Sequence, residues 1–315
     1  MSSSAVLEFA RAAAAGLTDT PRWLPCQYLY DARGSRLFEE ITRQPEYYQT
    51  RTEGAILASA AATIRAQTGD VTLIELGSGS SEKTDHLLKA YAVGDEVVRY
   101  VPVDVSRDAI RQAADRLATE HPDVEVSGLI GRYEESFPLF REHSPSMVIF
   151  LGSTIGNFNH GESIRFWRSV AKNLEEGDHF LLGVDLVKDP SVLEAAYNDA
   201  AEVTAAFTKN LFVRMNQELG AGVDVDQLEH VARYNDEWQQ IEIFARFLTA
   251  QSLRIDPLDA TIEIAAGEQV MVEISRKFVL ENLAMYLSVL GFELQDVFTD
   301  EREWFAVLLL KRKPG

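Results

Sequence analysis

The feature of the sequence that most constrains the fold is an alternation of short apolar runs with helical patterns between residues 71 and 185. The apolar runs are TLIEL (72–76), RYVPVDV (99–105), VEVSGLI (124–130), MVIFLG (147–152) and HFLLGVD (179–185). The clearest helical pattern runs from Ser106 to Glu120, with apolar residues at i, i+3, i+4 and i+7 from Ile110. Strands that alternate with helices are joined by right-handed crossovers, so this region predicts a doubly wound α/β sheet of parallel strands.

The C-terminal segment departs from this alternation. A helical pattern from Leu280 to Leu290 is followed by two strand patterns, FELQDVFT (292–299) and WFAVLLLKR (304–312). Strands joined by so short a connection pair antiparallel. The predicted fold is therefore a seven-stranded, doubly wound sheet that ends in an antiparallel hairpin. It resembles the Rossmann-like sheet of S-adenosylmethionine (SAM) methyltransferases.

Two segments lie outside the predicted sheet. Residues 1–52 precede it, and residues 188–277 separate its fifth strand from its last helix. The second segment carries a helical stretch (190–211) and then alternating patterns that predict the strands of a small separate sheet. We therefore expect a SAM-binding domain at residues 53–187 and 278–315. The remaining two segments are expected to form a discontinuous α+β lid domain that binds the substrate.

The loop after the first apolar run indicates what the sheet binds. Gly77 and Gly79 follow TLIEL, but Glu82 stands where a dinucleotide fingerprint requires a third glycine, which disfavours a nicotinamide dehydrogenase. Glu75 adds a carboxylate, which suits an ammonium or sulfonium group better than a phosphate. Asp104 ends the second strand, where an acid accepts hydrogen bonds from ribose hydroxyls. This combination favours SAM, and the alternative is a tight turn that binds no ligand.

Further cofactor candidates follow the other strands. Lys83 begins the next helical pattern and is either the partner of the cofactor's methionine carboxylate or a solvated surface lysine. Gly152 ends the fourth run, where the sheet's edge is expected to face the cofactor's methyl group. Arg132 and Tyr133 stand where methyltransferases of this class often carry an acid that accepts from the adenine amino group. Either a backbone carbonyl replaces that acid or the adenine is held by stacking.

The composition limits the possible partners. The formal net charge of −19 disfavours nucleic acids and anionic membranes, and no apolar run is long enough to span a bilayer. Cys26 is the only cysteine and the N-terminus lacks a basic signal region, so we expect a cytoplasmic protein. The six histidines are scattered, with no pair at i,i+4, so we expect no metal site. We also expect a monomer whose partner is a small molecule.

Five stretches give the chain a resemblance to a known family. They are YDARGSRLFEEITRQPEYYQTRTE (30–53), ELGSGSSEKT (75–84), FLGSTIGN (150–157), DLVKD (185–189) and EISRKF (273–278). In the same order and over nearly the whole chain, they resemble the histidine Nα-methyltransferases of ergothioneine biosynthesis. The glycine loop is shared with many methyltransferases, whereas the tyrosine-bearing N-terminal stretch and the later motifs are far more specific. The resemblance implies trimethylation of the α-amino group of free L-histidine by three SAM molecules, giving hercynine.

The resemblance also implies roles for cofactor residues. Gly77, Lys83 and Asp104 match the family's cofactor positions. Arg132 departs from the family, since it replaces the acid that contacts adenine. The expected cofactor site is therefore similar to the family's at the ribose and methionine ends, and different at the adenine.

For the substrate, the resemblance implies that Asn157 and Tyr197 hold the carboxylate, and that Tyr30 and Tyr47 line the pocket near the amino group and the ring. An asparagine amide both donates and accepts, which suits the polar end of an amino acid, although a turn role is the alternative. For the tyrosines the alternative is ordinary core packing. If they line the pocket, their faces suit a methylated ammonium, and a tyrosine hydroxyl or water accepts the amine's proton.

Glu273 and Ser275 match the pair that hydrogen-bonds the imidazole in the family, and Ile243 stands where known members carry a methionine against the ring. Residues two apart on a strand share one face. There, a carboxylate accepts from a ring N–H and a hydroxyl donates to the bare nitrogen. The alternative for this pair is a solvated strand face.

Three functions remain compatible with these patterns. The first is histidine Nα-methylation. The second is the same reaction on another free amino acid such as tryptophan, in a pocket that Ile243 reshapes. The third is a SAM-binding module without catalysis, which the intact substrate residues disfavour.

Overall fold

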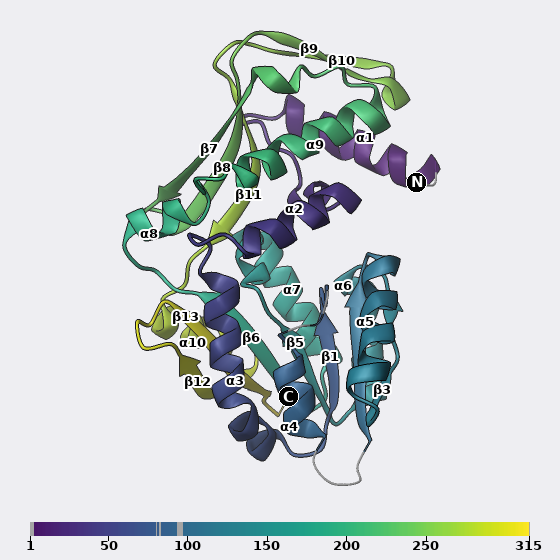
Figure 1. The fold of residues 1–315 in the computed structure, drawn as a ribbon, viewed down its shortest axis with the longest axis vertical. Helices are drawn as coiled ribbons and strands as arrows, with labels where there is room; N and C mark the ends of the chain where they lie inside the picture. The colour runs from purple at the N-terminus through teal and green to yellow at the C-terminus, as the bar shows by residue number, and fades with distance from the viewer. Residues whose placement is uncertain (1–2, 80, 82, 93–96, 315) are drawn as a thin grey trace. The chain divides into compact units, whose positions relative to one another are not determined.

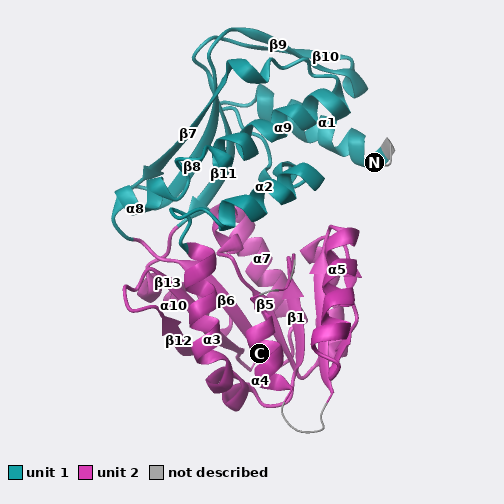
Figure 2. Cartoon of the chain, in the orientation of Figure 1, with its two compact units in different colours: residues 1–48, 188–276 teal, residues 49–187, 277–315 magenta. Residues whose placement is uncertain are grey.

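The computed structural model describes residues 3–79, 81, 83–92 and 97–314, and the chain divides into two compact units (Figure 2). Unit 1 comprises residues 1–48 and 188–276, and unit 2 comprises residues 49–187 and 277–315. The first boundary lies at residue 49 rather than 53, because helix α3 (Gln49–Thr68) begins there as one continuous element of unit 2.

Unit 2 is built on one sheet (Figure 1). In spatial order its strands are β12 (Phe292–Thr299), β13 (Phe305–Arg312), β6 (His179–Asp185), β5 (Ser146–Phe150), β1 (Thr72–Leu76), β2 (Val98–Asp104) and β3 (Val124–Val126). The strands from β6 to β3 pair in parallel, whereas β13 pairs antiparallel with both β6 and β12. The predicted doubly wound sheet with a C-terminal antiparallel hairpin is therefore confirmed.

The third predicted strand is wrong in one respect. VEVSGLI forms two short strands, β3 and β4 (Leu129–Ile130), which pair in succession with β2. Between them, a Cβ added to Gly128 would lie 2.5 Å from Cγ2 of Ile110 in α5 (Arg107–Glu120). The close approach of this helix coincides with the interruption, and the described sheet has eight strands rather than seven.

Helices pack on both faces of the sheet, and each face has its own apolar core. Trp167 of α7 (His160–Asn173) is fully buried in one core, and Leu57 of α3 is fully buried in the other. Strand β5 is buried along its whole length, as expected for a strand covered on both faces. The unit also contains α4 (Asp85–Tyr91), α6 (Tyr133–Ser136), α10 (Leu280–Val289) and short 3-10 helices at Phe137–His143 and Thr154–Asn157.

Unit 1 combines helices with two small antiparallel sheets. Its helices are α1 (Ser3–Thr18), α2 (Ala32–Thr42), α8 (Pro190–Ala195) and α9 (Val203–Leu219), with 3-10 turns at Cys26–Leu29, Val225–Gln227 and Asp256–Leu258. One sheet has β8 (Gln240–Phe247) between β7 (Leu228–Asn235) and β11 (Gln269–Arg276), and the other pairs β9 (Gln251–Ile255) with β10 (Ala260–Ile264). Unit 1 thus combines helices and strands from two chain segments that are distant in sequence.

Two expectations for unit 1 are wrong in detail. The helical stretch at 190–211 is two helices, since α8 ends at Ala195 and α9 begins at Val203. The Asp199 carboxylate accepts hydrogen bonds from the N–H groups of Val203 (2.7 Å) and Thr204 (2.8 Å), in the first turn of α9. The expected separate sheet is two sheets, and one of them includes β7, which was missed because apolar and polar residues do not alternate in LEHVARYN.

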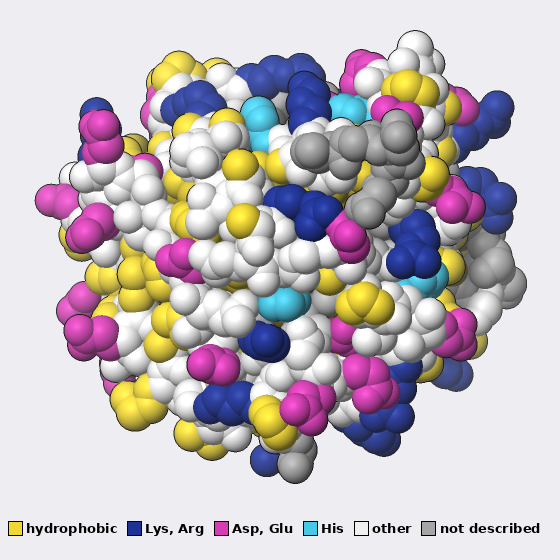
Figure 3. All heavy atoms as spheres, turned by 90° about the horizontal axis from the view of Figure 1, so that it is seen from below, with side chains coloured by type: hydrophobic (Ala, Val, Ile, Leu, Met, Phe, Trp, Pro, Cys, Tyr) yellow, Lys and Arg dark blue, Asp and Glu magenta, His cyan; other side chains and the backbone are white. Residues whose placement is uncertain are grey.

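The surface carries charges of both signs. On the face in Figure 3, the coloured Asp and Glu side chains are interspersed with Lys, Arg and apolar ones, so the acid excess does not gather there into one patch. No helix in the described part of the chain is both long and apolar enough to cross a bilayer.

Candidate active site

The glycine loop follows β1 in unit 2. Gly77 and Gly79 both have positive φ, +67° and +51°, which favours glycine at these positions. The N–H of Gly77 donates to the carbonyl of Val103 in β2 (2.8 Å), which ties the loop to the neighbouring strand. A Cβ added to Gly79 would meet no atom within 4 Å, and the buried Oγ of Ser78 has no hydrogen-bond partner among the described residues. The loop thus borders open space and offers a polar atom to a ligand.

Asp104 connects the end of β2 to this loop. Its Oδ2 accepts a hydrogen bond from the N–H of Gly79 (3.1 Å), and its Oδ1 accepts one from the N–H of Ser106 (2.8 Å). Each carboxylate oxygen has a second lone pair, so this side chain can also accept from ribose hydroxyls. Glu82, where a third glycine is missing, lies outside the described residues.

Glu75 anchors the loop from within the unit. Its Oε1 accepts a hydrogen bond from the hydroxyl of Thr84 (2.7 Å) and its Oε2 accepts one from the hydroxyl of Tyr100, which is also bonded to Ser81. Burial raises the pKa of Glu75 to about 7, against the opposing effect of the two hydroxyls and of nearby Lys83. The carboxylate is buried, so the prediction that Glu75 faces a ligand as a counter-charge is wrong. Glu75 instead holds the loop through its hydrogen bonds.

Lys83 and Gly152 are joined through a residue that the sequence motifs did not single out. Glu53 of α3 is completely buried, accepts hydrogen bonds from the N–H of Gly152 (2.8 and 3.0 Å) and forms an ion pair with Lys83. Gly152 follows β5 and has a φ of +74°. The signal that reveals Glu53 is an acid on the buried side of a helix whose other buried residues are mostly apolar.

Tyr133 lies beside the glycine loop at the start of α6. Its hydroxyl oxygen would be 3.1 Å from a Cβ added to Gly77, and its ring contacts Phe150 edge-on with centroids 5.4 Å apart. Arg132 precedes it as an exposed residue, and Asn157 is a half-buried residue at the end of the 3-10 helix after β5. Of the two adenine candidates, Tyr133 is therefore the one whose side chain lies beside the glycine loop.

Three candidate tyrosines belong to one aromatic cluster in unit 1. Tyr47 lies edge-on to Phe38 of α2 (6.3 Å between ring centroids) and to Tyr197 (6.2 Å). Tyr30 lies edge-on to Phe38 (5.6 Å) and to Phe207 of α9 (5.3 Å). Phe38 thus lies between Tyr30 and Tyr47, and Tyr47 connects them to the sequence-distant Tyr197. Neither phenylalanine was identified from the sequence, because an apolar residue on a helix carries no signal that separates a pocket wall from core.

Glu273, Ser275 and Ile243 lie on one face of the β11–β8 pair. Glu273 is directly opposite Ile243, and opposed residues in an antiparallel pair have side chains on the same face. The hydroxyl of Tyr197 donates to Oγ of Ser275 (2.8 Å), which connects this face to the aromatic cluster. A serine that accepts one hydrogen bond retains the ability to donate another. All six substrate candidates of unit 1 are therefore linked through contacts within that unit.

His230 of β7 holds the segment that carries Tyr197. Its Nε2 lies 2.9 Å from the carbonyl oxygen of Tyr197, and its Nδ1 lies 2.9 Å from Oγ1 of Thr208 in α9. Burial lowers the pKa of His230, so the ring is neutral at pH 7, donating through Nε2 and accepting from Thr208. His230 was not identified from the sequence as a positioning residue, because its partners are contributed by other elements.

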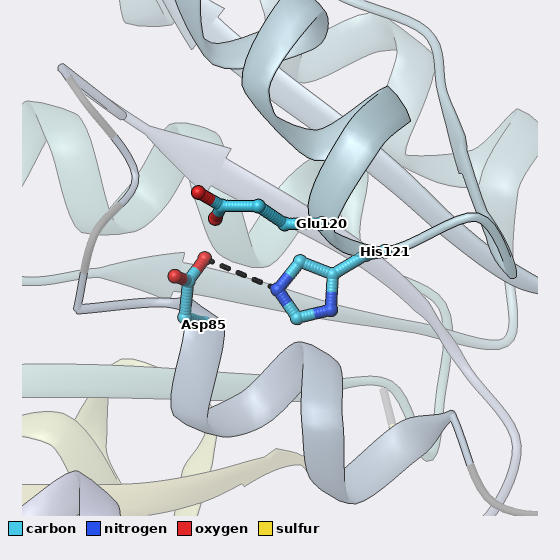
Figure 4. A group of neighbouring side chains, drawn as sticks. All are labelled: Asp85, Glu120 and His121. Carbon is cyan, nitrogen blue, oxygen red and sulfur yellow. Dashed lines mark ion pairs between the residues drawn. The ribbon is translucent and has the colours of Figure 1, made fainter.

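Asp85, Glu120 and His121 approach one another in unit 2 although no metal site was expected (Figure 4). One ligand atom from each lies within 4.8 Å of the others, and Nε2 of His121 is 3.6 Å from Oδ1 of Asp85. Arg116 donates to both carboxylates, at 2.8 Å to Asp85 and 2.6 Å to Glu120. Because this guanidinium already balances the carboxylates, the group is an ion-pair cluster in which a cation would have to displace an arginine.

Comparison with known proteins adds independent findings. A family model described as "Histidine-specific methyltransferase, SAM-dependent" matches residues 9–312. Histidine N-alpha-methyltransferase of Mycolicibacterium smegmatis is 43% identical over 298 residues, covering 95% of this chain and 93% of that protein. The protein of the same name from Mycobacterium tuberculosis is 39% identical over 93% of this chain and 92% of its own length. Ergothioneine biosynthesis protein 1 of Neurospora crassa is 29% identical over 94% of this chain, which corresponds to 34% of that protein.

Proposed function

The chain belongs to the family of histidine-specific, SAM-dependent methyltransferases, and we propose that it trimethylates the α-amino group of free L-histidine to hercynine, the first step of ergothioneine biosynthesis. The observation that carries the proposal is the face of unit 1 on which Glu273 and Ser275 stand side by side, with Ile243 directly across from Glu273. An acceptor and a donor at this spacing match the two nitrogens of a neutral imidazole, and an apolar neighbour matches its ring face.

Unit 2 binds SAM in this proposal. Asp104 accepts from the ribose hydroxyls, the Gly77 and Gly79 backbone lies along the nucleoside, and Tyr133 stacks on the adenine. The open space beside Gly79 and the buried hydroxyl of Ser78 support the fit of such a ligand. Arg132 is exposed and stands where related enzymes carry an acid. In this proposal its backbone carbonyl, in place of a carboxylate, accepts from the adenine amino group.

The methionine end of SAM is assigned to Lys83 and to the backbone around Gly152. Lys83 offers an ammonium to the cofactor's carboxylate, and Gly152 leaves the backbone without a side chain after β5. SAM supplies a methyl group on a positively charged sulfur, which is already activated for displacement. The protein's contribution is then to position the amine in line with that carbon and to exclude water.

Unit 1 sets the choice of amino acid. Glu273 accepts from one ring nitrogen, and Ser275, itself bonded to Tyr197, donates to the other. An amino acid whose side chain leaves this pair without partners loses about 1–3 kcal/mol for each buried polar group left unsatisfied. The substrate's carboxylate is assigned to Asn157, whose amide carries N–H donors, and to Tyr197, whose single hydroxyl proton then turns from Oγ of Ser275 to the carboxylate.

Each of the three transfers needs a neutral amine. The substrate nitrogen loses one proton, then its lone pair forms the new N–C bond while the C–S bond breaks and its electrons remain on sulfur. We assign the proton to water or to a tyrosine hydroxyl, of which Tyr47 and Tyr30 are the candidates in the aromatic cluster. Their ring faces also accommodate the growing methylated cation.

The proposed reaction requires no metal, because the methyl group of a sulfonium needs no Lewis acid to react. A single cysteine fits the reducing cytosol, where we expect the enzyme to act as a monomer on a free amino acid.

The proposal is tested by competition. The protein is incubated with SAM carrying a labelled methyl group and with equal concentrations of histidine, tryptophan, phenylalanine and glutamine, and the labelled products are separated. We expect label in histidine derivatives only. Label in tryptophan would assign the same chemistry to a different substrate, and label in no amino acid would leave a SAM-binding module.

A further inference from the structure

Glu53 occupies an unusual position on α3. The helix buries a face formed by apolar residues at the spacing of helical turns, namely Ile56, Leu57, Ala60, Ala61 and Ile64. Glu53 precedes them on the same face and its side chain is 0% exposed. An ionised carboxylate is costly in such a place unless it is paired and hydrogen-bonded, so its partners account for its position.

Those partners are two residues assigned above to the methionine end of SAM. Both oxygens of Glu53 accept from the N–H of Gly152 (2.8 and 3.0 Å), and one of them pairs with the ammonium of Lys83. The side chain of Lys83 is 27% exposed, and its Nζ would lie 3.7 Å from a Cβ added to Gly152. One buried carboxylate therefore holds the end of a flexible side chain beside the backbone that follows β5.

The sheet leaves room for this carboxylate. Gly183 lies inside β6, and a Cβ added to it would overlap Oε1 of Glu53. A glycine inside a strand weakens the strand, and it often marks a place where another group approaches the backbone closely. The space that the Glu53 carboxylate occupies therefore depends on Gly183 of β6 as well as on α3.

We infer that Glu53 is a positioning residue for the methionine end of SAM, an inference that rests on the function proposed above. Its carboxylate holds the Lys83 ammonium beside Gly152 before the cofactor binds. An ammonium has three N–H donors, so it can serve the carboxylates of Glu53 and of the ligand together. Fixing a long lysine side chain beforehand reduces the entropy lost when the ligand's carboxylate arrives.

The inference is tested with two ligands that differ only at that end. S-adenosylhomocysteine (SAH) retains the amino-acid part, whereas 5′-methylthioadenosine lacks it. In calorimetry of Glu53→Gln, we expect the Kd for SAH to rise about tenfold, or ~1.4 kcal/mol, and the Kd for methylthioadenosine to stay within about twofold. In a Lys83→Met background, the Glu53 substitution should add no further loss of SAH affinity, because its effect passes through Lys83.

Asp178 provides the matched control. It is also a buried carboxylate that accepts from backbone N–H groups, those of Ser146 and Glu175 (both 2.9 Å), but it precedes the amino end of β6. Asp178→Asn should destabilise the fold and leave both affinities unchanged. If Glu53→Gln does not fold, Glu53→Asp, which keeps the charge but shortens the reach, should show the same selective loss for SAH.

Three results would overturn the inference. Unchanged SAH affinity in Glu53→Gln would show that Lys83 needs no positioning, and an equal loss for both ligands would indicate a purely structural role. A wild-type chain that binds neither ligand would contradict the proposed function itself and, with it, this inference.

Discussion

The two units hold their candidate residues by different means. In unit 2, backbone groups and one lysine near the strand ends are held by acids, namely the buried Glu53 and Glu75 and the half-buried Asp104, which each accept hydrogen bonds from the segments they position. In unit 1, side chains from separate chain segments meet through edge-on aromatic contacts and one hydroxyl pair. In the proposed function, the cofactor is therefore held mainly by backbone and charged groups at strand ends, whereas the substrate is selected by a packed cluster of side chains.

The largest expected effect tests the buried acids of unit 2. Because burial raises the pKa of Glu75 to about 7 from an ordinary value of 4.5, the folded chain keeps a proton that the unfolded chain loses between these pH values. Stability contributed by this group therefore falls as pH rises through that window, by about 3 kcal/mol in total. Between pH 4.5 and 8, the free energy of unfolding of Glu75→Gln should gain this amount relative to wild type.

Urea denaturation at a series of pH values measures this difference. Lys83 and Glu53 are the charges near Glu75, and both are retained in the variant. The exposed Glu263 of β10 serves as the control, since Glu263→Gln removes a carboxyl group but retains Glu75 and the pH-dependent loss of stability that Glu75 causes. A constant difference between Glu75→Gln and wild type would mean that the buried acid is ionised throughout, and that unit 2 depends less on hydrogen-bonded acids than we describe.

The next effect separates the two units. Glu273→Ala removes the acceptor for the ring N–H, and loss of a hydrogen bond to a charged group, about 1.5–3 kcal/mol, lowers kcat/KM for histidine by roughly 10–100-fold. The affinity for SAH should not change, because the cofactor residues belong to unit 2. Steady-state kinetics and calorimetry on the same preparation measure both quantities, with Glu263→Ala as the control. A parallel loss of SAH affinity would contradict the proposal that unit 1 binds the substrate and unit 2 binds the cofactor.

The smallest effect concerns a single hydroxyl in the aromatic cluster. Tyr47→Phe keeps the ring that contacts Phe38 and Tyr197, so we expect kcat to fall only about three- to tenfold, the size of one neutral hydrogen bond. Tyr28→Phe is the control, since the ring of this buried tyrosine stacks on Phe9, which is not a candidate residue. Full activity of Tyr47→Phe would show that the Tyr47 hydroxyl does not accept the substrate's proton.

Local patterns were sufficient to predict the sheet of unit 2. TLIEL and HFLLGVD coincide with β1 and β6, because buried parallel strands are short apolar runs with clear ends. The break at Gly128 was missed because it depends on Ile110, which another element brings close. Glu53 was missed for a similar reason, since its partners follow β1 and β5.

The candidate residues of unit 1 were accessible only through resemblance. The alternation in VMVEISRKF placed Glu273 and Ser275 on one face, but no local pattern indicates that Tyr197 bonds to Ser275 or that Phe38 joins the tyrosines. The register that sets Ile243 opposite Glu273 is likewise a property of the folded sheet. Long-range pairings of this kind leave no trace in a short stretch of sequence.

The most direct measurement localises the methyl groups on the product. Histidine is incubated with the protein and excess SAM, and tandem mass spectrometry distinguishes methylation at the α-nitrogen from methylation at the ring. We predict mono-, di- and finally trimethylated histidine, with every methyl group on the α-nitrogen and the imidazole unmodified. Methyl groups on a ring nitrogen would contradict the assignment of Glu273 and Ser275 to the imidazole, and unmodified histidine would contradict the proposed activity.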